Sequence, residues 1–526
     1  MSFPNFPVYA GALVLSVFSC AAQSPSISGG RIRAHVKYLA SDLLEGRGVG
    51  ERGGQLTEEY LAAQLAIAGA RPAGENGTYF QTVPMVGVQT QPDAQLSGAG
   101  VKLKWQDEFV GSTHRQNASE SFEADVVFVG HGIVSKPESW DDYKNTDVNG
   151  KIVVVFTNEP QPDNPEVFKG RTLTYAGRWV YKFEEAARKG ALGCIIIHTN
   201  PTAGYSWEVV RNSWSKEDPQ MKLEEGQTAL AFAGWVTSEA AGKLLATSGH
   251  SVESLLKASD SRDFVPIPLK FKLSVRLKTK IRQIRSRNVL GMIPGSETQR
   301  VTEAVLYSAH WDHLGVALAV KGDSIYNGAI DNATGVAIVL DLAKVWGELR
   351  QKPGRSVVFA FWTAEESGLR GAEYFSRNPT MPPNRIAVNL NYDVIMPSGR
   401  SKNIVVAGAE RTSVWPIVQE VAKRHDLEIA PDPRPEQGSY YRSDQFVLAK
   451  IGIPAFKIRT GAENAGGASD YNTSHYHQPS DEYDPNWDFA SLEQAGRFGF
   501  LLGLNIANSP TLPRWNAGDE FAITRR

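Results

Sequence analysis

The sequence predicts an α/β fold in two parts: a mixed, mostly parallel central sheet flanked by helices, and a smaller, β-rich α/β unit inserted into it. From Asn288 onward, short apolar strands alternate with longer helical patterns, which is typical of parallel-rich sheets covered on both faces. Between about 122 and 275 the pattern is different, with short strands dominating. The chain, at 526 residues, is also too long for one compact core, since single cores stop growing near ~250–300 residues.

The composition argues against a membrane-embedded protein and against a nucleic-acid-binding protein. Hydrophobic residues make up 42% and charged residues 21% of the chain, and the formal net charge is −2, which is typical of soluble globular proteins. Lys and Arg are balanced by Asp and Glu along most of the chain, so no nucleic-acid partner is expected. No stretch predicts a transmembrane span.

The first residues predict an exported protein. Residues 7–19 form an apolar run that is too short to span a bilayer, and Cys20 follows it. We interpret residues 1–24 as a signal peptide or lipoprotein signal, with a buried N-terminal helix as the alternative. The expected location is the periplasm, the outer membrane as a lipoprotein anchored through Cys20, or the medium outside the cell.

Cysteine usage predicts no intramolecular disulfide. Cys20 and Cys194 are the two cysteines of the chain, and Cys20 is either cleaved away or acylated in the interpretation above. Cys194 lies in an apolar run at 192–197, where a small buried side chain is favoured over a reactive thiol.

The pattern along the chain predicts its divisions. Apolar side chains recur at helical spacing over 31–69, interrupted by a Gly-rich loop at 45–48. The inserted unit is expected to hold strands at 126–129, 152–155 and 195–197 and a helix near 176–189. We divide the chain into the signal (1–24), the first part of the larger domain (27–110), the insertion (111–282), the main part of the larger domain (283–509) and a tail (510–526).

Strands and helices alternate through the main part of the larger domain. Strands are expected near 288–293, 303–309, 355–362, 386–391, 403–407 and 453–458, and helices near 333–349, 367–377, 412–425 and 488–507. In open sheets of this kind, ligands bind beyond the carboxyl ends of the strands. Polar residues that directly follow a strand are therefore the candidates for a functional site.

A histidine and a carboxylate follow the strand at 303–309. His310 and Asp312 lie two residues apart, which suits a metal ligand and its orienting partner, because a metal-bound imidazole commonly gives its other N–H to a carboxylate. The same pair could also lie on a solvated turn without a functional role. For this motif alone, a metal site and a solvated turn therefore both stay open.

Acidic residues follow at two further boundaries. Asp331 lies among small residues before an apolar helix, where it could bind metal, bridge two cations or, like Asn332, cap the helix. Glu365 and Glu366 follow the strand at 355–362 and point in different directions, so that one could hold metal while the other acts as a general base. Acids that complement a helix dipole are the alternative.

The last candidates are one aspartate and two histidines. Asp393 closes the strand at 386–391, and His475 and His477 lie in a later loop. Each residue is ambiguous by itself. Their shared position after strands or on loops, with oxygen and nitrogen donors and no thiolate, favours a metal centre.

In order and context, these motifs resemble the co-catalytic zinc aminopeptidase family, which includes bacterial leucyl aminopeptidases and the glutamate carboxypeptidases. The similarity extends over roughly 31–509 and is strongest between 288 and 481. It is carried by His310-x-Asp312-His313-Leu314-Gly315, the run 328–335, Glu365-Glu366-x-Gly368-Leu369, Asp393, Ser443-Asp444 and Tyr476-His477-x-x-x-Asp481.

The resemblance implies a centre of two zinc ions, or of another divalent cation. One ion would be held by His310 and Asp393 and the other by Glu366 and His477. Asp331 would bridge the two ions, and its peptide bond to the next residue is expected to be cis. His475 remains a spare histidine.

The resemblance also implies an activity: a zinc exopeptidase, first of all an aminopeptidase, that hydrolyses terminal bonds of peptide substrates through a water shared by the metal ions. Glu365 would be the general base and Tyr476 a hydrogen-bond donor to the developing oxyanion. Asp312 and Asp481 would support the ligands from behind. Arg442 could contact a substrate carboxylate or simply be solvated.

Some features of the sequence qualify this resemblance. Ile330 stands where many relatives have an acidic residue, and Gln445 where histidine is common, but neither is an expected ligand. The insertion resembles the protease-associated domain in its turn at 147–151 and its helix end at 186–191.

Two other functions stay open. A glutaminyl cyclase would work with a single zinc ion, whereas the presence of both His310 and Asp393 favours two. A receptor-like binding protein that had lost the chemistry would lack some of the ligands. A serine hydrolase is disfavoured, because no Gly-x-Ser-x-Gly elbow occurs in the strand-to-helix turns. Oligomeric state and the preferred terminal residue are not predicted.

Overall fold

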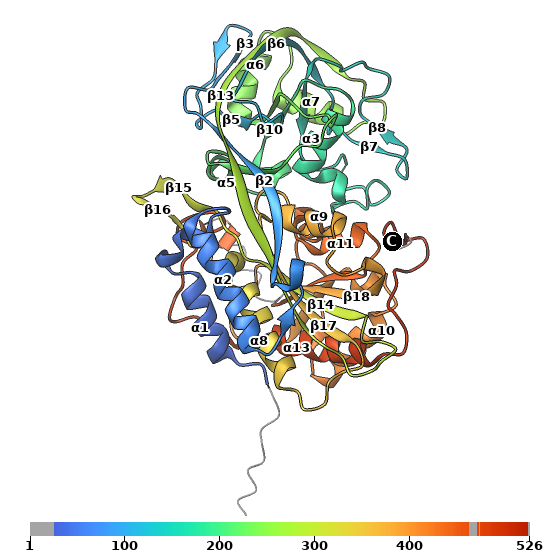
Figure 1. Ribbon diagram of the computed structural model, residues 1–526. Coiled ribbons are helices and arrows are strands. Elements are labelled where there is room, and N and C mark those ends of the chain that lie inside the picture. Colours follow the sequence, from blue (N-terminus) through green and yellow to red (C-terminus); the bar gives the residue numbers. More distant parts are fainter. Residues whose placement is uncertain (1–25, 162, 462–470, 473, 524–526) are drawn as a thin grey trace, which may run out of the picture.

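The computed structural model describes residues 26–161, 163–461, 471–472 and 474–523. The predictions of a signal peptide and of an anchor at Cys20 fall on residues outside these ranges. The chain forms two units, one above the other in Figure 1, with the N-terminal and C-terminal segments together in the lower unit. Among the described helices, none combines the length and the apolar character needed to cross a membrane.

The lower unit is built on a mixed sheet whose middle strands are parallel. β17 (Ser356–Trp362), β14 (Ala304–His310), β18 (Ile386–Asn391) and β21 (Ala455–Thr460) follow one another in this order. β19 (Asn403–Ala407) and β20 (Glu428–Ile429) extend the β21 side, and β13 (Ile267–Ile293) runs antiparallel to β17 on the other side. The predicted mixed, mostly parallel sheet is confirmed.

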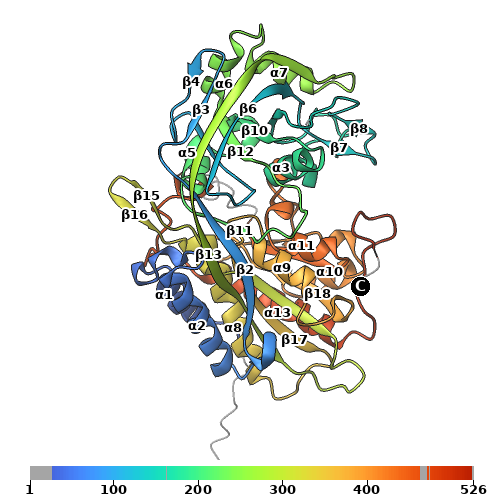
Figure 2. The ribbon, with the colours of Figure 1, turned by 45° about the horizontal axis from the view of Figure 1, so that its top comes forward.

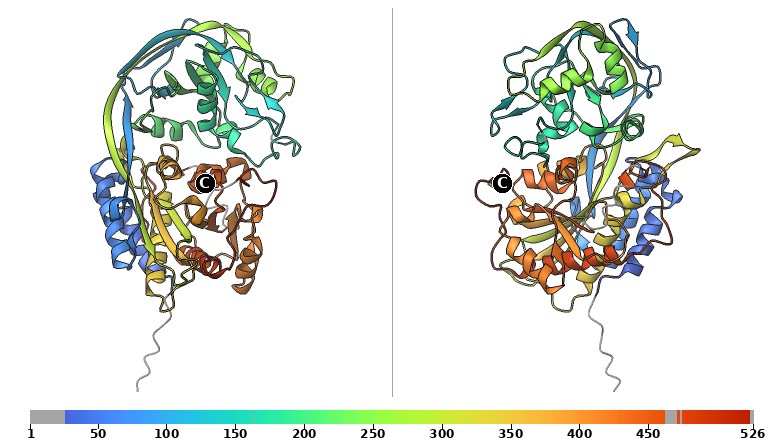
Figure 3. Two further views of the ribbon diagram at one scale, coloured as in Figure 1. Left: turned by 45° about the vertical axis from the view of Figure 1, so that its right-hand side comes forward. Right: turned by 180° about the vertical axis from the view of Figure 1, so that it is seen from behind.

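Helices cover both faces of this sheet, which explains why its strands are apolar throughout. Val305 and Tyr307 of β14 belong to a core shared with helices on one face, whereas Ala304 and Leu306 belong to a core on the other face (Figure 3). The first set is α1 (Gly29–Leu39), α2 (Arg52–Ile67), α8 (Thr334–Glu348), α10 (Trp415–Arg424) and α13 (Ala490–Asn508). The second is α9 (Arg370–Arg377) and α11 (Gln445–Lys450).

The boundaries predicted from 303 onward lie within three residues of the observed strands and helices. The prediction of a strand confined to 288–293 is wrong, because β13 has 27 residues and begins at Ile267. Its first part alternates exposed Lys and Arg with buried apolar side chains, as a half-buried strand does.

The long strand β13 joins the two units. β2 (Phe80–Thr90) pairs antiparallel with its second half in the lower sheet. β3 (Gln95–Gly98) and β6 (Ser119–Phe128) pair with its first half in the upper sheet. Figure 2 shows β2 and β13 rising side by side from one unit to the other.

The upper unit holds a second sheet. β6, β9 (Ile152–Phe156), β10 (Gly193–His198) and β12 (Phe232–Thr237) are parallel, and β5 (Phe109–Ser112) pairs antiparallel with β12. Helices α3 (Trp179–Arg188), α6 (Ser238–Leu245) and α7 (Val252–Ser259) pack on it. Cys194 is a buried, free cysteine of β10, as predicted.

Short elements complete the fold. β15 (Gly315–Val320) and β16 (Asp323–Tyr326) form a separate hairpin. α5 (Trp207–Trp214) and β11 (Asp218–Met221) come from the chain of the upper unit, and β11 pairs with β2 in the lower sheet. The others are β1 (Arg71–Pro72), β4 (Val101–Lys102), β7 (Val134–Ser135), β8 (Trp140–Asp141) and α4 (Asn200–Ala203).

Candidate metal centre

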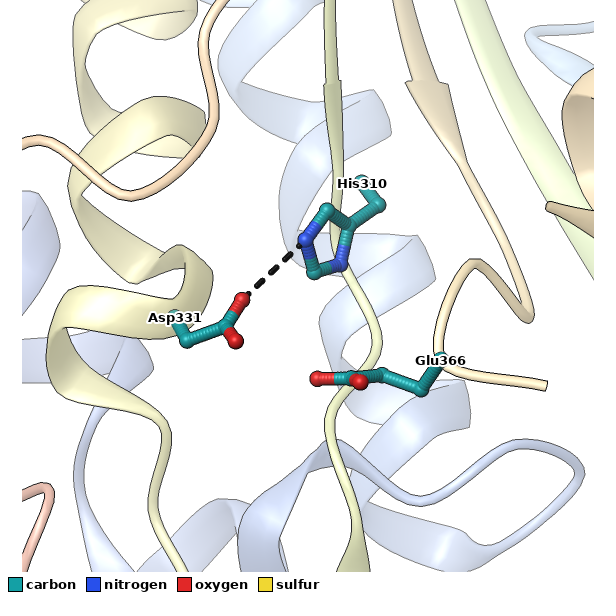
Figure 4. Close-up of side chains that lie close together, drawn as sticks. All are labelled: His310, Asp331 and Glu366. Atoms are coloured by element: carbon teal, nitrogen blue, oxygen red, sulfur yellow. Dashed lines mark ion pairs between the residues drawn. The ribbon is translucent and has the colours of Figure 1, made fainter. Parts of the chain in front are cut away.

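The sequence-predicted ligands converge beyond the carboxyl ends of the parallel strands. His310 is the last residue of β14, Asp393 follows β18, and Glu366 follows β17. Asp331 lies in the turn before α8, and His477 lies in the later loop. Figure 4 shows His310, Asp331 and Glu366 facing one another. Parallel topology brings these residues together, because it places successive strand ends on the same edge of the sheet.

The carboxylate of Asp331 lies between the two imidazoles. Its Oδ1 is 3.2 Å from His310 Nε2, and its Oδ2 is 3.7 Å from His477 Nε2. The Asp331–Asn332 peptide bond is cis, as predicted. Two oxygens of one side chain that face two separate nitrogens suit a carboxylate that bridges two cations.

The first half of the centre lies around His310. Its Nε2 is 3.5 Å from Asp393 Oδ1 and 3.9 Å from Glu365 Oε2. One donor atom from each of His310, Glu365 and Asp393 lies within 4.8 Å of the others, and the same holds for His310, Asp331 and Glu366. These clusters are compact enough to share cations.

The second half lies around His477 and provides a test of whether the donors fit a metal. His477 Nε2 is 2.9 Å from Glu366 Oε2, yet this buried nitrogen makes no hydrogen bond to any described residue. A buried polar atom is ordinarily paired, so an unbonded nitrogen that faces carboxylate oxygens fits a metal ligand. The absence of thiolates and the mixture of imidazole and carboxylate suit zinc.

Burial and crowded charges control the protonation of these groups in the chain without metal. Burial raises the pKa of Glu365 well above its usual range; His310 opposes this shift and the carboxylate of Glu366 adds to it. Burial alone would lower the pKa of His477, but Glu366 and Asp331 outweigh it and raise this pKa to about 9. A bound cation would lower the pKa of Glu365, because positive charge favours the carboxylate.

Asp312 and Asp481 both lie behind the ligands, but Asp312 acts differently from the expectation. His310 Nδ1 is 3.2 Å from the backbone oxygen of Asp312 and 3.8 Å from its carboxylate. That carboxylate accepts the backbone N–H of Glu365 at 3.1 Å instead, so it holds the turn after β17. Asp481 accepts the backbone N–H of Asp331 at 3.1 Å and that of Ile330 at 2.9 Å, which orients the bridging loop.

The structure also places the remaining candidates. His475 Nδ1 lies 2.9 Å from the backbone oxygen of Ser480. The ring of Tyr476 stacks on His477 at a centroid distance of 4.0 Å. Arg442 donates to the Tyr476 hydroxyl at 3.3 Å.

The helix-capping alternatives are divided between neighbouring residues. Asn332 Oδ1 accepts the backbone N–H of Gly335 at 3.0 Å, so Asn332 caps the start of α8 while Asp331 faces the histidines. Helix α9 begins at Arg370, later than predicted. Glu365 and Glu366 therefore lie in a turn before the helix, and the interpretation of them as first-turn acids is wrong.

Sequence reasoning missed several residues that support the site. His313 Nδ1 lies 2.6 Å from Glu366 Oε1, and Lys457 Nζ donates to Asp393 Oδ2 at 2.8 Å. Arg47 is fully buried and donates to the backbone oxygens of Trp311 and Gly328, at 2.9 and 2.8 Å. A lysine inside the apolar strand β21 was the clearest available signal.

A cavity of about 590 Å³ opens beside this centre, between the two units. Glu365, Glu366 and His477 line it from below, and Arg178 and Tyr205 line it from the inserted segment. The guanidinium of Arg178 makes no hydrogen bond or ion pair with the described residues. The cavity is polar where it meets the candidate metal centre, as a substrate site would be.

This fold and donor set define the class of the protein: an α/β protein with a candidate metal centre at the carboxyl edge of its sheet. Comparison with known proteins then relates the larger domain to a family. Residues 288–498 match the model described as Peptidase family M28.

Individual relatives are consistent with this assignment. Aminopeptidase NAALADL1 of Mus musculus is 36% identical over 116 residues, which cover 21% of this chain and 13% of the relative. Glutamate carboxypeptidase 2 homolog of Caenorhabditis elegans is 26% identical over 326 residues, covering 52% and 38%. The chain thus spans well under half the length of these relatives.

Solved structures share the fold over most of the chain. The aminopeptidase from Aneurinibacillus sp. strain AM-1 has a TM-score of 0.56 at 17% identity and covers 92% of this chain and 95% of its own. BSAP, a zinc aminopeptidase from Bacillus subtilis, has a TM-score of 0.51 at 16% identity, covering 95% and 98%. At such identities the likeness shows the fold alone.

Proposed function

We propose that this chain is a zinc-dependent exopeptidase, first of all an aminopeptidase, with two zinc ions or another divalent pair. The observation that carries the proposal is Asp331, whose two oxygens face His310 and His477 at 3.2 and 3.7 Å. The names of similar proteins, which include an aminopeptidase and a zinc aminopeptidase, support the same activity.

The residues would divide the work as follows. His310 and Asp393 would hold one ion, Glu366 and His477 the other, and Asp331 both. Two zinc ions in these positions would lower the pKa of a water and polarise the scissile carbonyl.

Glu365 and Tyr476 would act on the substrate from the cavity wall. Glu365 lies beside the donor cluster. It would accept a proton from the attacking water and pass it to the leaving amine. Burial raises the pKa of Tyr476, which keeps the hydroxyl protonated. Because Arg442 donates to the oxygen of Tyr476, the hydroxyl proton is available for a hydrogen bond to a developing oxyanion.

A second candidate is an exopeptidase or dipeptidase that requires a free carboxylate on its substrate. Arg178 and Arg442 line the same cavity, and burial together with the positive charge of Arg442 lowers the pKa of Arg178 to about 10. Two guanidiniums close enough to repel each other are suited to share an anion. Neither guanidinium pairs with a carboxylate among the described residues.

A panel of substrates separates these activities. An aminopeptidase would hydrolyse aminoacyl anilides and peptide amides but not N-acetylated peptides. A carboxylate-dependent enzyme would cleave free dipeptides or N-acetylated peptides and would lose activity on peptide amides. In such an enzyme, Arg442→Met would raise KM for substrates with a free carboxylate about 10–100-fold, as expected for the loss of a charge-assisted contact. No hydrolysis after zinc is restored would contradict both, and one zinc per chain would instead support a glutaminyl cyclase.

We also propose an exported location, periplasmic, lipoprotein-anchored at the outer membrane or secreted, on the basis of the apolar run at 7–19 and Cys20. Fractionation of cells that express the full chain, with Cys20→Ser as the comparison, tests it. Recovery of the protein in the cytoplasm with an intact N-terminus would contradict this location.

A further inference from the structure

The upper unit contacts a candidate metal ligand directly. Helix α5 ends at Trp214, and its last turn reaches the loop that carries His477. Ser213 Oγ lies 2.9 Å from His477 Nδ1, and Asn212 Nδ2 donates to the backbone oxygen of His477 at 3.1 Å. Asn212 is fully buried and also approaches Gln478 Oε1 at 3.3 Å.

These contacts match what a metal-binding histidine needs. If Nε2 of His477 faces the cation, its Nδ1 carries the proton and needs an acceptor, and the hydroxyl oxygen of Ser213 is in place to accept it. The backbone of His477 has a φ of 55°, in the left-handed region that non-glycine residues rarely adopt. The bond from Asn212 to the carbonyl of His477 helps to hold this backbone.

The other half of the centre has no such dependence. Among the described residues, the partners of His310 and Asp393 come from the lower unit: Asp312, Asp331, Glu365 and Lys457. Among the described residues, the upper unit therefore contacts the half of the centre that contains His477 and makes no such contact with His310 or Asp393.

We propose that Asn212 and Ser213 are positioning residues through which the inserted unit completes the half of the metal centre that contains His477. The inference rests on the proposed function to the extent that His477 binds metal. It implies that metal affinity in this half and docking of α5 against the His477 loop stabilise each other, because coupling between two binding events is reciprocal.

The test is zinc binding by the metal-stripped full chain, measured by competition with a chromogenic chelator, with Ser213→Ala, Ser213→Thr and Ser215→Ala. Ser213→Ala should weaken one of two zinc equivalents about 10–100-fold and leave the other unchanged, as losses of ligand-orienting partners do. Ser213→Thr keeps the hydroxyl and should restore affinity. Ser215→Ala is the matched control, because its hydroxyl, in the residue after α5, has no hydrogen-bond partner among the described residues.

The outcomes separate this inference from the proposed function. Two zinc equivalents in the wild type with both affinities unchanged in Ser213→Ala overturn the inference alone. Equal weakening of both equivalents also overturns it, because that result indicates a general loss of structure. A wild type that binds one zinc, weakened by Ser213→Ala and restored by Ser213→Thr, supports the inference and overturns the two-metal function.

In a second measurement, cobalt is bound in place of zinc. The visible absorption of Co²⁺ depends on the geometry of its ligands, so the spectrum of one of two bound equivalents should change in Ser213→Ala and return in Ser213→Thr. Identical spectra in all four proteins would contradict a positioning role for Ser213.

Discussion

The two halves of the candidate metal centre are built in different ways. His310 is the last residue of β14, and Asp393 follows the neighbouring strand β18. Lys457 of β21 donates a hydrogen bond to Asp393. Glu366 and His477, by contrast, lie on loops, and their side chains contact His313 and Ser213 respectively. Asp331 belongs to both halves.

This difference teaches that one metal centre can combine two sources of order. Strand ends in a fully buried sheet are held by the ladder and the core, whereas loop residues need side-chain partners from elsewhere. We therefore expect the half at His310 to be preorganised by the sheet and the half at His477 to be sensitive to changes far away in the sequence.

The largest expected effect is a loss of turnover without a loss of zinc from either half of the centre. Glu365→Gln should keep both zinc equivalents while kcat falls by ~10²–10⁴, because the change removes a general base and no assigned ligand. Kinetics and metal analysis of the same preparation measure the two quantities. Wild-type turnover in this variant would show that Glu365 is not the base.

The second effect concerns the bridge between the halves. Asp331→Asn should weaken the binding of both zinc equivalents, because Asp331 faces both imidazoles. Asp393→Asn should weaken the binding of one, because of the two imidazoles Asp393 approaches only that of His310. Calorimetric titration of the stripped variants with zinc would show the contrast. If Asp331→Asn weakened the binding of only one zinc equivalent, Asp331 would not be a bridging ligand.

A third effect appears when metal is removed. In the stripped chain the pKa of His477 is raised to about 9 by neighbouring carboxylates, so the stabilisation from its protonated form is complete below pH ~6.5 and is lost as the pH rises toward 9. The loaded chain has no such proton to lose. The difference in Tm between loaded and stripped protein should therefore widen from pH 6.5 to 9.

Thermal unfolding in a series of buffers measures this difference, and His477→Gln is the comparison. That variant should show a smaller widening, because it loses both a titrating imidazole and an assigned zinc ligand. A difference in Tm that narrows with rising pH would contradict the assigned protonation.

The smallest effect tests the half at His310. Lys457→Met removes a positive charge 2.8 Å from Asp393, so one zinc equivalent should bind about tenfold more tightly through reduced like-charge repulsion. Lys457→Arg retains the charge and should bind as the wild type does. Weaker zinc binding in Lys457→Met would mean that Lys457 orients Asp393 rather than opposing the cation.

Much of this site could be predicted because its donors follow regular strands. Apolar periodicity located β14, β17 and β18 to within one residue, and His310, Glu366 and Asp393 are found by reading what comes after them. Local pattern could not show that Asn332 caps α8 while Asp331 faces the histidines, because both residues fit either role.

The supporting contacts could not be predicted, because they join distant residues. Ser213 and His477 are 264 positions apart, and Arg47 and Gly328 are 281 apart. The long strand β13 was also underestimated, since its alternating charged half contains no continuous apolar run.

By itself, the sequence determined the α/β architecture and the kinds of donor atom at the strand ends, because hydrophobic period and residue chemistry are local properties. Tertiary structure alone decided that Asp331 faces two imidazoles, that Arg178 and Arg442 share a cavity, and that α5 supports His477. The first relation depends on how loops of the lower unit pack at the edge of its sheet, and the other two depend on how the two units pack on each other. No local pattern encodes that geometry.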